Sequence, residues 1–354
     1  MIYRESGQFK TSYRADQAIL PIFQDKIAMI LLMIFAFVVI PVIANDYWLG
    51  SILIPFLALS LAALGLNVLT GYAGQLSLGT AAFMAVGAFA AYNLQVRVPE
   101  VPFLIAFLWG GLCAAGVGIL FGLPSLRIKG FYLAVATLAA QFFIEWLFTH
   151  FDWFTNYSSS GVITALPMEL FGFSIDNPLS KYILVLSVVV LCAFGVRNLV
   201  RSEIGRAWMA VRDMDIAAEA IGINLMKTKL LAFAVSSFLC GISGALFAYV
   251  YLGSVEPEAF NIMRSFQILF MIVIGGLGSV SGAFLGAGFI ILTPIVLNNI
   301  GVLFGGTIST DTVAHIEHMI FGALIIFFLI VEPNGLARLW QIGKEKLRLW
   351  PFPY

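Results

Sequence analysis

The feature that most constrains this sequence is a series of apolar runs, each long enough to cross a lipid bilayer as one helix. Crossing the hydrocarbon core takes about 20 apolar residues in an α-helix. Runs near this length lie at roughly 27–44, 51–69, 78–96, 102–122, 131–149, 181–199, 229–252 and 315–331. Only 11% of the residues are charged and 61% are hydrophobic, whereas about a quarter of a soluble domain is charged. The sequence therefore predicts an all-α, polytopic membrane protein with about 8–10 transmembrane helices.

The basic residues indicate which side of the membrane each loop faces. Of the 19 Lys and Arg residues, all but Arg97, Lys181 and Arg264 lie near the two termini, within 124–130 or within 197–229. Basic segments next to membrane spans face the cytoplasm. We therefore expect both termini and the central basic segment to be cytoplasmic, and the long loop before the sixth run to lie outside.

This topology divides the chain into three parts. We predict a cytoplasmic N-terminal segment at 1–26, a transmembrane domain at 27–331 and a cytoplasmic C-terminal tail at 332–354. The first apolar run has no small-residue cleavage pattern after it, so we interpret it as a retained helix and not as a signal peptide.

A further apolar run, at 266–298, is interrupted by the sequence GGLGSVSG at 275–282. Because the C-terminus is expected in the cytoplasm, this run must cross the membrane an even number of times. It is short for two complete crossings at about 1.5 Å per residue. We therefore expect a broken or re-entrant element, with a short segment up to the glycine cluster and a full helix from about Ser281 to Asn298.

The same glycine-rich pattern occurs earlier in the chain. The stretches GYAGQLSLGTAAFMAVGAF at 71–89 and GGLGSVSGAFLGAGF at 275–289 each place a glycine-rich turn with serine before a helix rich in Gly, Ala and Phe. Transporters often contain related halves with broken helices, whose N-termini present free N–H groups to the substrate near the membrane midplane. The alternative is that small residues let helices pack closely, as the spacing of Gly282 and Gly286 also permits.

On the transport interpretation, residues of these turns line a translocation path. The candidates are Asn67, Gly74, Gln75, Ser77, Gly79, Gly275, Gly276, Gly278 and Ser279. For Asn67 and Gln75, and for Gln141 in a neighbouring span, an interhelical hydrogen bond is the alternative role. Only Glu145 among the acidic residues lies well within a span. Ion-coupled carriers place ionisable groups inside the bundle, so this scarcity argues against a self-powered transporter.

Motifs for catalysis and metal binding are missing from the sequence. The chain has no GxxxxGK[ST] phosphate loop, no HExxH and no Cys/His zinc spacing. Cys113, Cys192 and Cys240 lie in apolar runs and are interpreted as buried side chains. His315 and His318 lie near a membrane boundary, where polar side chains are ordinary. We therefore predict no catalytic residue, no metal site and no cofactor bound by this chain, and the net charge of +0 gives no reason to expect nucleic acid.

One compact charged segment, EIGRAWMAVRDMDIAAEAIG at 203–222, interrupts this apolar chain. On a single helix its apolar stripe comprises Ala207, Val211, Met214, Ala218 and Ile221. Its other stripe comprises Trp208, Arg212, Asp215 and Glu219. Gly222 fits a helix stop. A helix on the lipid surface has a polar face dominated by Lys and Arg, so the mixed charge of this segment favours a protein partner.

Four stretches carry a family resemblance. The segment GRAWMAVRDMDIAAEAIGINLMKTKLLAF resembles the cytoplasmic coupling segment of ABC-transporter permeases, which docks into an ATPase subunit. The LivM-type permeases of branched-chain amino acid importers have further signatures that resemble AGQLSLGTAAFMAVGAFAA, PSLRIKGFYLAVATLA and IGGLGSVSGAFLGA. The resemblance runs from about Leu61 to Gly335. A strict EAA triplet would place Glu where Ile216 stands, so the coupling motif is EAA-like only.

The resemblance implies an all-helical ABC importer permease in the bacterial plasma (inner) membrane. Its partners would be a LivH-type permease, two cytoplasmic P-loop ATPase subunits that use the ATP, and an external solute-binding protein. The matching coupling positions are Glu203, Gly205, Arg206, Arg212, Asp213, Ala218, Glu219 and Gly222. The expected function is import of branched-chain or related amino acids by alternating access. The alternatives are import of urea or another small organic acid and, less favoured, ion-coupled secondary transport.

The long outside loop at about 150–180 has two interpretations under this resemblance. It is either a docking face for the solute-binding protein or an ordinary interfacial loop with an aromatic anchor. The residues concerned are Asp152, Trp153, Glu169 and Asp176.

Overall fold

The computed structural model describes residues 11–12, 23–123, 131–158, 161–170, 173–303, 316, 319–320, 322–324, 326–328, 330 and 335–349. The positions considered above that lie outside the described residues are Arg4, Lys10, Arg14, Arg127, Lys129, His315 and His318. The expected span at 315–331 is described only in part, so it stays a prediction, and so does the division of the chain at residues 26 and 331.

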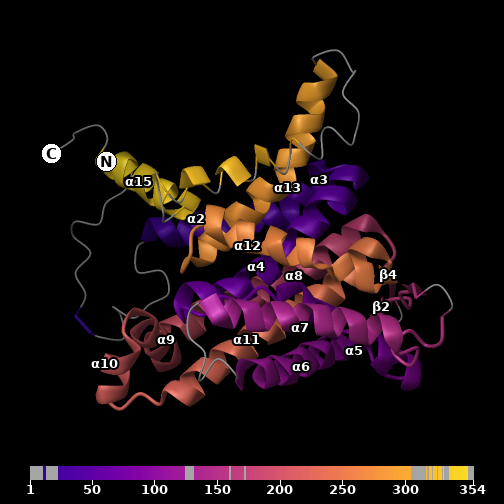
Figure 1. Cartoon of the computed structure of the whole chain (residues 1–354). Coiled ribbons are helices and arrows are strands. Elements are labelled where there is room, and N and C mark those ends of the chain that lie inside the picture. The colour runs from indigo at the N-terminus through magenta and orange to yellow at the C-terminus, as the bar shows by residue number, and fades with distance from the viewer. Residues whose placement is uncertain are drawn as a thin grey trace.

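The described chain is built almost entirely from helices (Figure 1). The N-terminal half contains α2 (Phe23–Ile34), η1 (Phe35–Val39), α3 (Ile40–Ile43), η2 (Trp48–Leu53), α4 (Ile54–Asn67), η3 (Val68–Tyr72), α5 (Thr80–Arg97), α6 (Phe103–Gly122) and α7 (Phe131–His150). The C-terminal half contains α8 (Pro178–Arg201), α9 (Glu203–Asp213), α10 (Asp215–Ala220), α11 (Leu225–Leu246), η5 (Phe247–Leu252), η6 (Pro257–Phe260), α12 (Ile262–Gly275), α13 (Val280–Leu303) and α15 (Gly335–Leu349). The segments η1, η2, η3 and η5 are π-helical, and η6 is a 3₁₀-helix.

Four very short strands lie in the loops. They are β1 (Ile163–Thr164), β2 (Glu169–Leu170), β3 (Phe173–Ser174) and β4 (Ser254–Val255). β1 pairs antiparallel with β4 in the register Ile163 to Val255, which ties the long loop to the end of η5. β2 and β3 form a small antiparallel hairpin.

Within the described residues, eight helical stretches are long and apolar enough to cross a membrane. The all-α, polytopic fold predicted from the sequence is therefore confirmed. The helix expected at 78–96 forms as α5 but is not one of these eight. Nearly all its side chains are buried, because α5 is packed between α6, α7, α11 and α12. The lipid-facing character of the bundle lies instead on outer helices such as α2 and α6, where Leu31 and Leu112 are exposed.

Small residues set the distance between the central helices. A Cβ added to Gly87 of α5 would lie 2.2 Å from the carbonyl oxygen of Gly241 in α11. A Cβ on Gly244 would lie 2.0 Å from the carbonyl oxygen of Met84. The backbones of α5 and α11 therefore approach more closely than any side chain permits, as is typical where membrane helices pack through small residues.

The break expected within 266–298 is confirmed, but the expected short first segment is wrong: Pro257–Gly275, which ends with α12, is itself one of the eight stretches long enough to cross a membrane, because helical residues before 266 extend it. The break separates the 14-residue helix α12 from the 24-residue helix α13 by residues 276–279. Gly286 of α13 faces α12, because a Cβ there would lie 1.8 Å from the carbonyl oxygen of Met271 in α12. The packing role of this glycine is therefore confirmed.

The bundle has two distinct ends. Figure 1 shows α9, α10 and α15 at one end and the short strands β2 and β4 at the other. The start of α2 belongs to the first end, because Nζ of Lys344 in α15 lies 3.0 Å from Oδ1 of Asp25. The segments predicted to be cytoplasmic therefore gather at one end of the molecule wherever they are described.

Candidate functional site

The charged segment at 203–222, called the coupling segment below, is two helices and not the single helix predicted. The backbone at Met214 is extended, with φ −159° and ψ 97°, and separates α9 from α10. Asp213 and Asp215 flank the break, and Asp is a poor residue for a helix interior. The carboxylate of Asp215 instead lies in the first turn of α10, where negative charge is favourable.

The break also divides the predicted apolar stripe. Val211 and Ala218 are buried, as the stripe predicts, whereas Met214 and Ile221 are 66% and 75% exposed. The largest buried side chain of the segment belongs to Trp208, which the pattern grouped with the charged residues. Its indole Nε1 donates a hydrogen bond of 3.0 Å to the carbonyl oxygen of Thr228 in α11.

The corner between α8 and α9 depends on Gly205. A Cβ at this position would lie 2.0 Å from the carbonyl oxygen of Val200, so no other residue fits without moving the helices apart. Arg206 is exposed and donates from Nη1 to the carbonyl oxygen of Arg201 at 3.0 Å, which satisfies one of the last carbonyl groups of α8. The N-terminal end of α9 is therefore fixed to the end of α8.

The helix stop predicted at Gly222 is confirmed. Gly222 has φ +93°, its N–H bonds to the carbonyl oxygen of Glu219, and the N–H of Ile223 bonds to the carbonyl oxygen of Ala218. This pair of bonds is the Schellman arrangement, which requires a left-handed residue and therefore favours glycine. The motif closes α10 after six residues.

The outer surface of the coupling segment combines apolar side chains with charges of both signs, since Arg206 is exposed along with acidic residues. Ile216 is 74% exposed, and Ile221 lies close to it in the sequence with a similar exposure. Glu203, Asp213 and Glu219 are also exposed. The segment thus has an inner side held in the bundle and an outer side that no described element covers.

The first glycine-rich turn, residues 71–79, contacts the inner side of the coupling segment. Nη1 of Arg212 donates a 2.9 Å hydrogen bond to the carbonyl oxygen of Gly71. Gly74 has φ +68°, and a Cβ there would lie 2.7 Å from Cγ of Arg212. Both the backbone conformation and the contact therefore require glycine at position 74.

The second glycine-rich turn, residues 275–279, meets the first. Gly276 and Gly278 have φ of +117° and +73°, and a Cβ on Gly275 would lie 2.0 Å from the carbonyl oxygen of Gly282. Asn67 at the end of α4 joins the two turns: its Nδ2 donates to the carbonyl oxygen of Ser279 at 2.7 Å. Its Oδ1 accepts from the N–H of Gly278 at 2.9 Å. The two turns with related sequences are therefore neighbours in space.

The N-terminus of α5 does not present free N–H groups, contrary to the expectation for a broken transporter helix. The hydroxyl oxygen of Thr137 accepts from the N–H of Leu78 at 2.9 Å. The hydroxyl oxygen of Ser265 accepts from Ala81, also at 2.9 Å. Oε1 of Gln141 accepts from the N–H of Ala82 at 2.7 Å, and Nε2 of Gln141 donates to Phe260. Side chains of α7 and α12 therefore fill this helix end.

These contacts separate the polar candidates. Asn67 and Gln141 make the interhelical hydrogen bonds that the alternative interpretation expects. Gly79 is a packing residue, because a Cβ there would lie 2.7 Å from the carbonyl oxygen of Thr137. Ser77 is buried and accepts from the N–H of Gly79 at 3.4 Å. The amide of Gln75 is buried and has no hydrogen-bond partner among the described residues.

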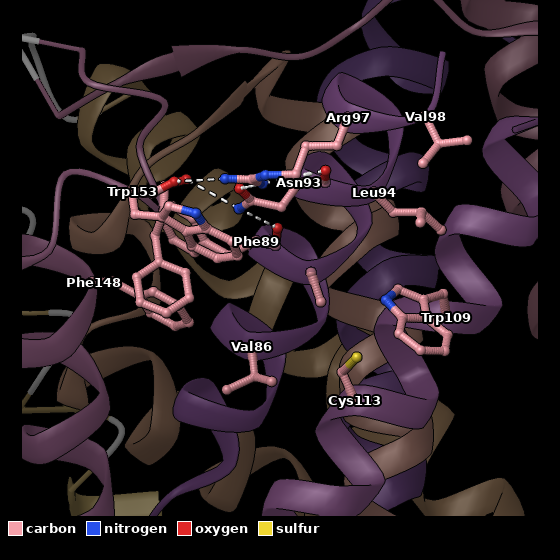
Figure 2. A pocket seen from close by; sticks show the side chains of 12 residues that line it. Val86, Phe89, Asn93, Leu94, Arg97, Val98, Trp109, Cys113, Phe148 and Trp153 are labelled. Atoms are coloured by element: carbon pink, nitrogen blue, oxygen red, sulfur yellow. Dashed lines mark hydrogen bonds between the residues drawn. The ribbon is translucent and has the colours of Figure 1, made fainter. Parts of the chain in front are cut away.

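A cleft of about 420 Å³ opens near the C-terminal end of α5 (Figure 2). Its walls are mostly apolar and include Phe89, Trp109 and Phe148. The guanidinium carbon of Arg97 lies 3.7 Å above the ring centre of Trp153, and Nη2 donates to the carbonyl oxygen of Trp153 at 3.2 Å. Nη1 of Arg97 also donates to Oδ1 of Asn93, as the dashed lines in Figure 2 show.

These contacts place Trp153 as an anchor of the long loop. Its indole lies beneath Arg97, and β1 pairs the loop with β4. Asp152, Glu169 and Asp176 are exposed along the same loop. Trp153 therefore fixes the loop to α5, and both the docking of a solute-binding protein and an aromatic anchor at the membrane interface stay predictions.

The described residues contain no group of three or more His, Cys, Asp or Glu side chains that could hold a metal ion. Fold and site together define a polytopic helical membrane protein in which a charged segment at one end is hydrogen-bonded to the first of two adjoining glycine-rich turns.

The family model for the permease component of branched-chain amino acid transport systems matches residues 48–329. The chain therefore belongs to this family. The resemblance of the four stretches to LivM-type permeases is thus confirmed.

Three relatives show how the similarity is distributed. The chain is 29% identical to the high-affinity branched-chain amino acid transport permease LivM of Escherichia coli over 296 residues, which is 77% of this chain and 66% of the relative. It is 23% identical to a probable LivM of Methanocaldococcus jannaschii over 329 residues, covering 81% and 92%. It is 27% identical to LivH of Salmonella typhimurium over 143 residues, covering 40% and 42%.

The chain thus spans 66% of the length of the Escherichia coli LivM that it matches. No solved structure gives a significant match.

Proposed function

We propose that this chain is the membrane-spanning permease subunit of an ABC importer that moves branched-chain or related amino acids into the cytoplasm. The observation that carries the proposal is the outer side of the coupling segment, where Ile216 and Ile221 are exposed beside the carboxylate of Glu219. Large apolar side chains exposed on a segment outside the membrane spans are typical of a site of protein interaction. Family membership and the similarity to LivM permeases support branched-chain amino acids as the substrate class.

The partners follow from the same surface and from the sequence. Two cytoplasmic P-loop ATPase subunits would supply the energy, because this chain has no phosphate loop of its own. A coupling surface that is partly apolar and carries charges of both signs suits a protein partner with complementary charge. The similarity to LivH supports a second, related permease beside this one. An external solute-binding protein would deliver the substrate to the opposite end.

The proposed orientation places the coupling segment in the cytoplasm of a bacterial inner membrane. Arg201 in the last turn of α8 and the basic residues of α9 and α15 lie at this end of the bundle, and the positive-inside rule assigns it to the cytoplasm. A single cysteine replacing Asp213, in a chain whose three native cysteines are removed, tests this directly. We expect labelling by an impermeant maleimide only in inverted vesicles, and labelling of intact cells would reverse the topology.

The mechanism we propose is alternating access. Closure of the ATPase subunits on ATP displaces α10 and, with it, α9. The two glycine-rich turns lie at the ends of α4 and α12 and open the path to alternate sides. Gln75 and Ser77 supply polar groups within the first turn. The side-chain amide of Gln75 makes no hydrogen bond to the described residues. Hydrolysis resets the complex.

The experiment that tests the proposal is gentle purification of the tagged chain from its own cells, followed by reconstitution in liposomes. We expect a P-loop ATPase and a second permease to copurify in fixed ratio, and ATP to drive uptake of a branched-chain amino acid in the presence of the binding protein. ATP-driven uptake of urea or a small organic acid instead would change the substrate class. Uptake by the isolated chain without ATP would contradict the proposal and favour a secondary transporter.

A further inference from the structure

Arg212 makes a contact inside the bundle that the sequence of the coupling segment does not predict. It belongs to the coupling positions, which are expected to face the ATPase, yet its guanidinium reaches the backbone of the first glycine-rich turn. Nε and Nη2 lie 2.9 Å from Oδ1 of Asp213, the next residue, and Nη1 donates to the carbonyl oxygen of Gly71. Asp213 thus holds the guanidinium plane while one N–H points into the bundle.

Glycines leave the space that this side chain fills. A Cβ on Gly74 would lie 2.7 Å from Cγ of Arg212, and a Cβ on Gly278 would lie 3.5 Å from its Nη1. The two turns also touch directly, because a Cβ on Gly71 would lie 2.3 Å from the backbone nitrogen of Gly278. Arg212 therefore sits against both turns where they meet.

Asn67 ties the end of α4, which leads into the first turn, to the second turn. Its amide donates to the carbonyl oxygen of Ser279 and accepts from the N–H of Gly278. The two turns are thus linked directly by the contact between Gly71 and Gly278, and indirectly by the two hydrogen bonds of Asn67, which precedes the first turn in the chain. The coupling segment contacts this pair of turns through Arg212, at the C-terminal end of α9.

We infer that Arg212 is a positioning residue that transmits the displacement of the coupling segment to the two glycine-rich turns, and not a residue that docks the ATPase. The inference rests on the proposed function and assigns the path of coupling within it. It separates two roles that the sequence groups together: docking belongs to the outer residues of α10, and transmission belongs to Arg212, whose side chain is 38% exposed but bonds to the first turn. Loss of Arg212 therefore uncouples ATP hydrolysis from substrate transport, while the ATPase subunits stay bound to the permease.

The test uses the reconstituted complex and records ATP hydrolysis, subunit composition and substrate uptake in the same preparation. For Arg212→Ala we expect normal copurification of the ATPase, retained ATP hydrolysis and a fall of about tenfold in substrate moved per ATP, since a hydrogen bond from a charged donor is lost. Arg212→Lys keeps a cationic donor and is expected to recover part of the ratio. Arg338→Ala on α15 removes an exposed arginine outside the site and is the matched control.

Gly74→Ala gives an independent measurement, because it leaves Arg212 in place and pushes a methyl group against its Cγ. The same fall in substrate per ATP is expected. A normal ratio in both variants would overturn the inference. Loss of the ATPase from the Arg212→Ala complex would also overturn it, since Arg212 would then be a docking residue. If Arg212→Ala does not accumulate, Gly74→Ala decides.

Failure of the proposed function gives a different result. The unmodified complex would then lack an ATPase or would show no ATP-driven uptake of any substrate tested.

Discussion

The two helices of the coupling segment differ in what holds them. α9 is fixed by Gly205 against α8, by the buried indole of Trp208 against α11, and by Arg212 against the first glycine-rich turn. α10 has six residues, of which only Ala218 is buried, and it is closed by a Schellman motif. One helix is part of the bundle and the other lies on its surface.

This difference assigns separate tasks to neighbouring residues. A helix that is fixed at several points moves only with the elements it contacts, so α9 can pass a displacement into the bundle. A short helix with exposed apolar side chains can bind a partner without disturbing the core. Substitutions in α9 should therefore change stability or coupling, and substitutions on the outside of α10 should change association alone.

The largest effect is expected at Trp208. Replacing this fully buried indole by Ala in Trp208→Ala leaves a cavity and removes the hydrogen bond to the carbonyl oxygen of Thr228, with an expected cost of about 3–5 kcal/mol in the free energy of unfolding. Denaturation of the detergent-purified chain measures it. Ile216→Ala on α10 is the control, and its cost should stay within about 0.5 kcal/mol. Equal losses for the two variants would remove the distinction between the helices.

A smaller effect, on association only, is expected at Ile216. Ile216→Lys replaces an exposed apolar side chain of α10 by a charged one. It should weaken binding of the ATPase subunit about tenfold or more, as loss of a central interface residue does. Titration of the purified ATPase onto the permease in nanodiscs measures the affinity. Leu339→Lys, an exposed leucine on α15, should leave it unchanged. An unchanged affinity for Ile216→Lys would mean that the partner binds elsewhere.

The smallest effect is expected at the end of α10. A Cβ on Gly222 meets nothing within 4 Å, so Gly222→Ala costs only the strain of φ +93°, about 1 kcal/mol. If the strain loosens α10, the affinity for the ATPase should fall severalfold while the stability of the bundle stays the same. Gly161→Ala in the loop at the opposite end carries the same kind of strain at φ +69° and should not change the affinity. Equal effects on affinity would contradict a specific role for α10.

The sequence predicts features that depend on neighbouring residues. Apolar runs predict the helices, glycine clusters predict the break between α12 and α13, and Gly222 predicts the end of α10. In each case the cause is local: lipid-compatible side chains or a backbone conformation that favours glycine. The mixed charge of the coupling segment can likewise be predicted from residues 203–222 alone.

Features that depend on distant residues are not predictable in this way. Gln141 fills the end of α5 from 59 positions away, and Asn67 bonds Ser279 across 212 positions. The burial of Trp208 depends on the carbonyl group of Thr228, which helical periodicity cannot reveal. The inward direction of Arg212 similarly depends on the glycines of both turns. A pair of aspartates around Met214 was the one local signal for the break in the coupling segment.

The most direct test of the account is site-specific photo-cross-linking in native membranes. A photoreactive residue replaces Ile216 on α10 in one chain and Leu191 on α8 in another, two positions with the same exposure of 74%. We predict that position 216 cross-links to a P-loop ATPase and that position 191 does not. Cross-linking of position 216 to lipid alone, or to no ATPase, would contradict the claim that α10 is the surface through which this permease is driven.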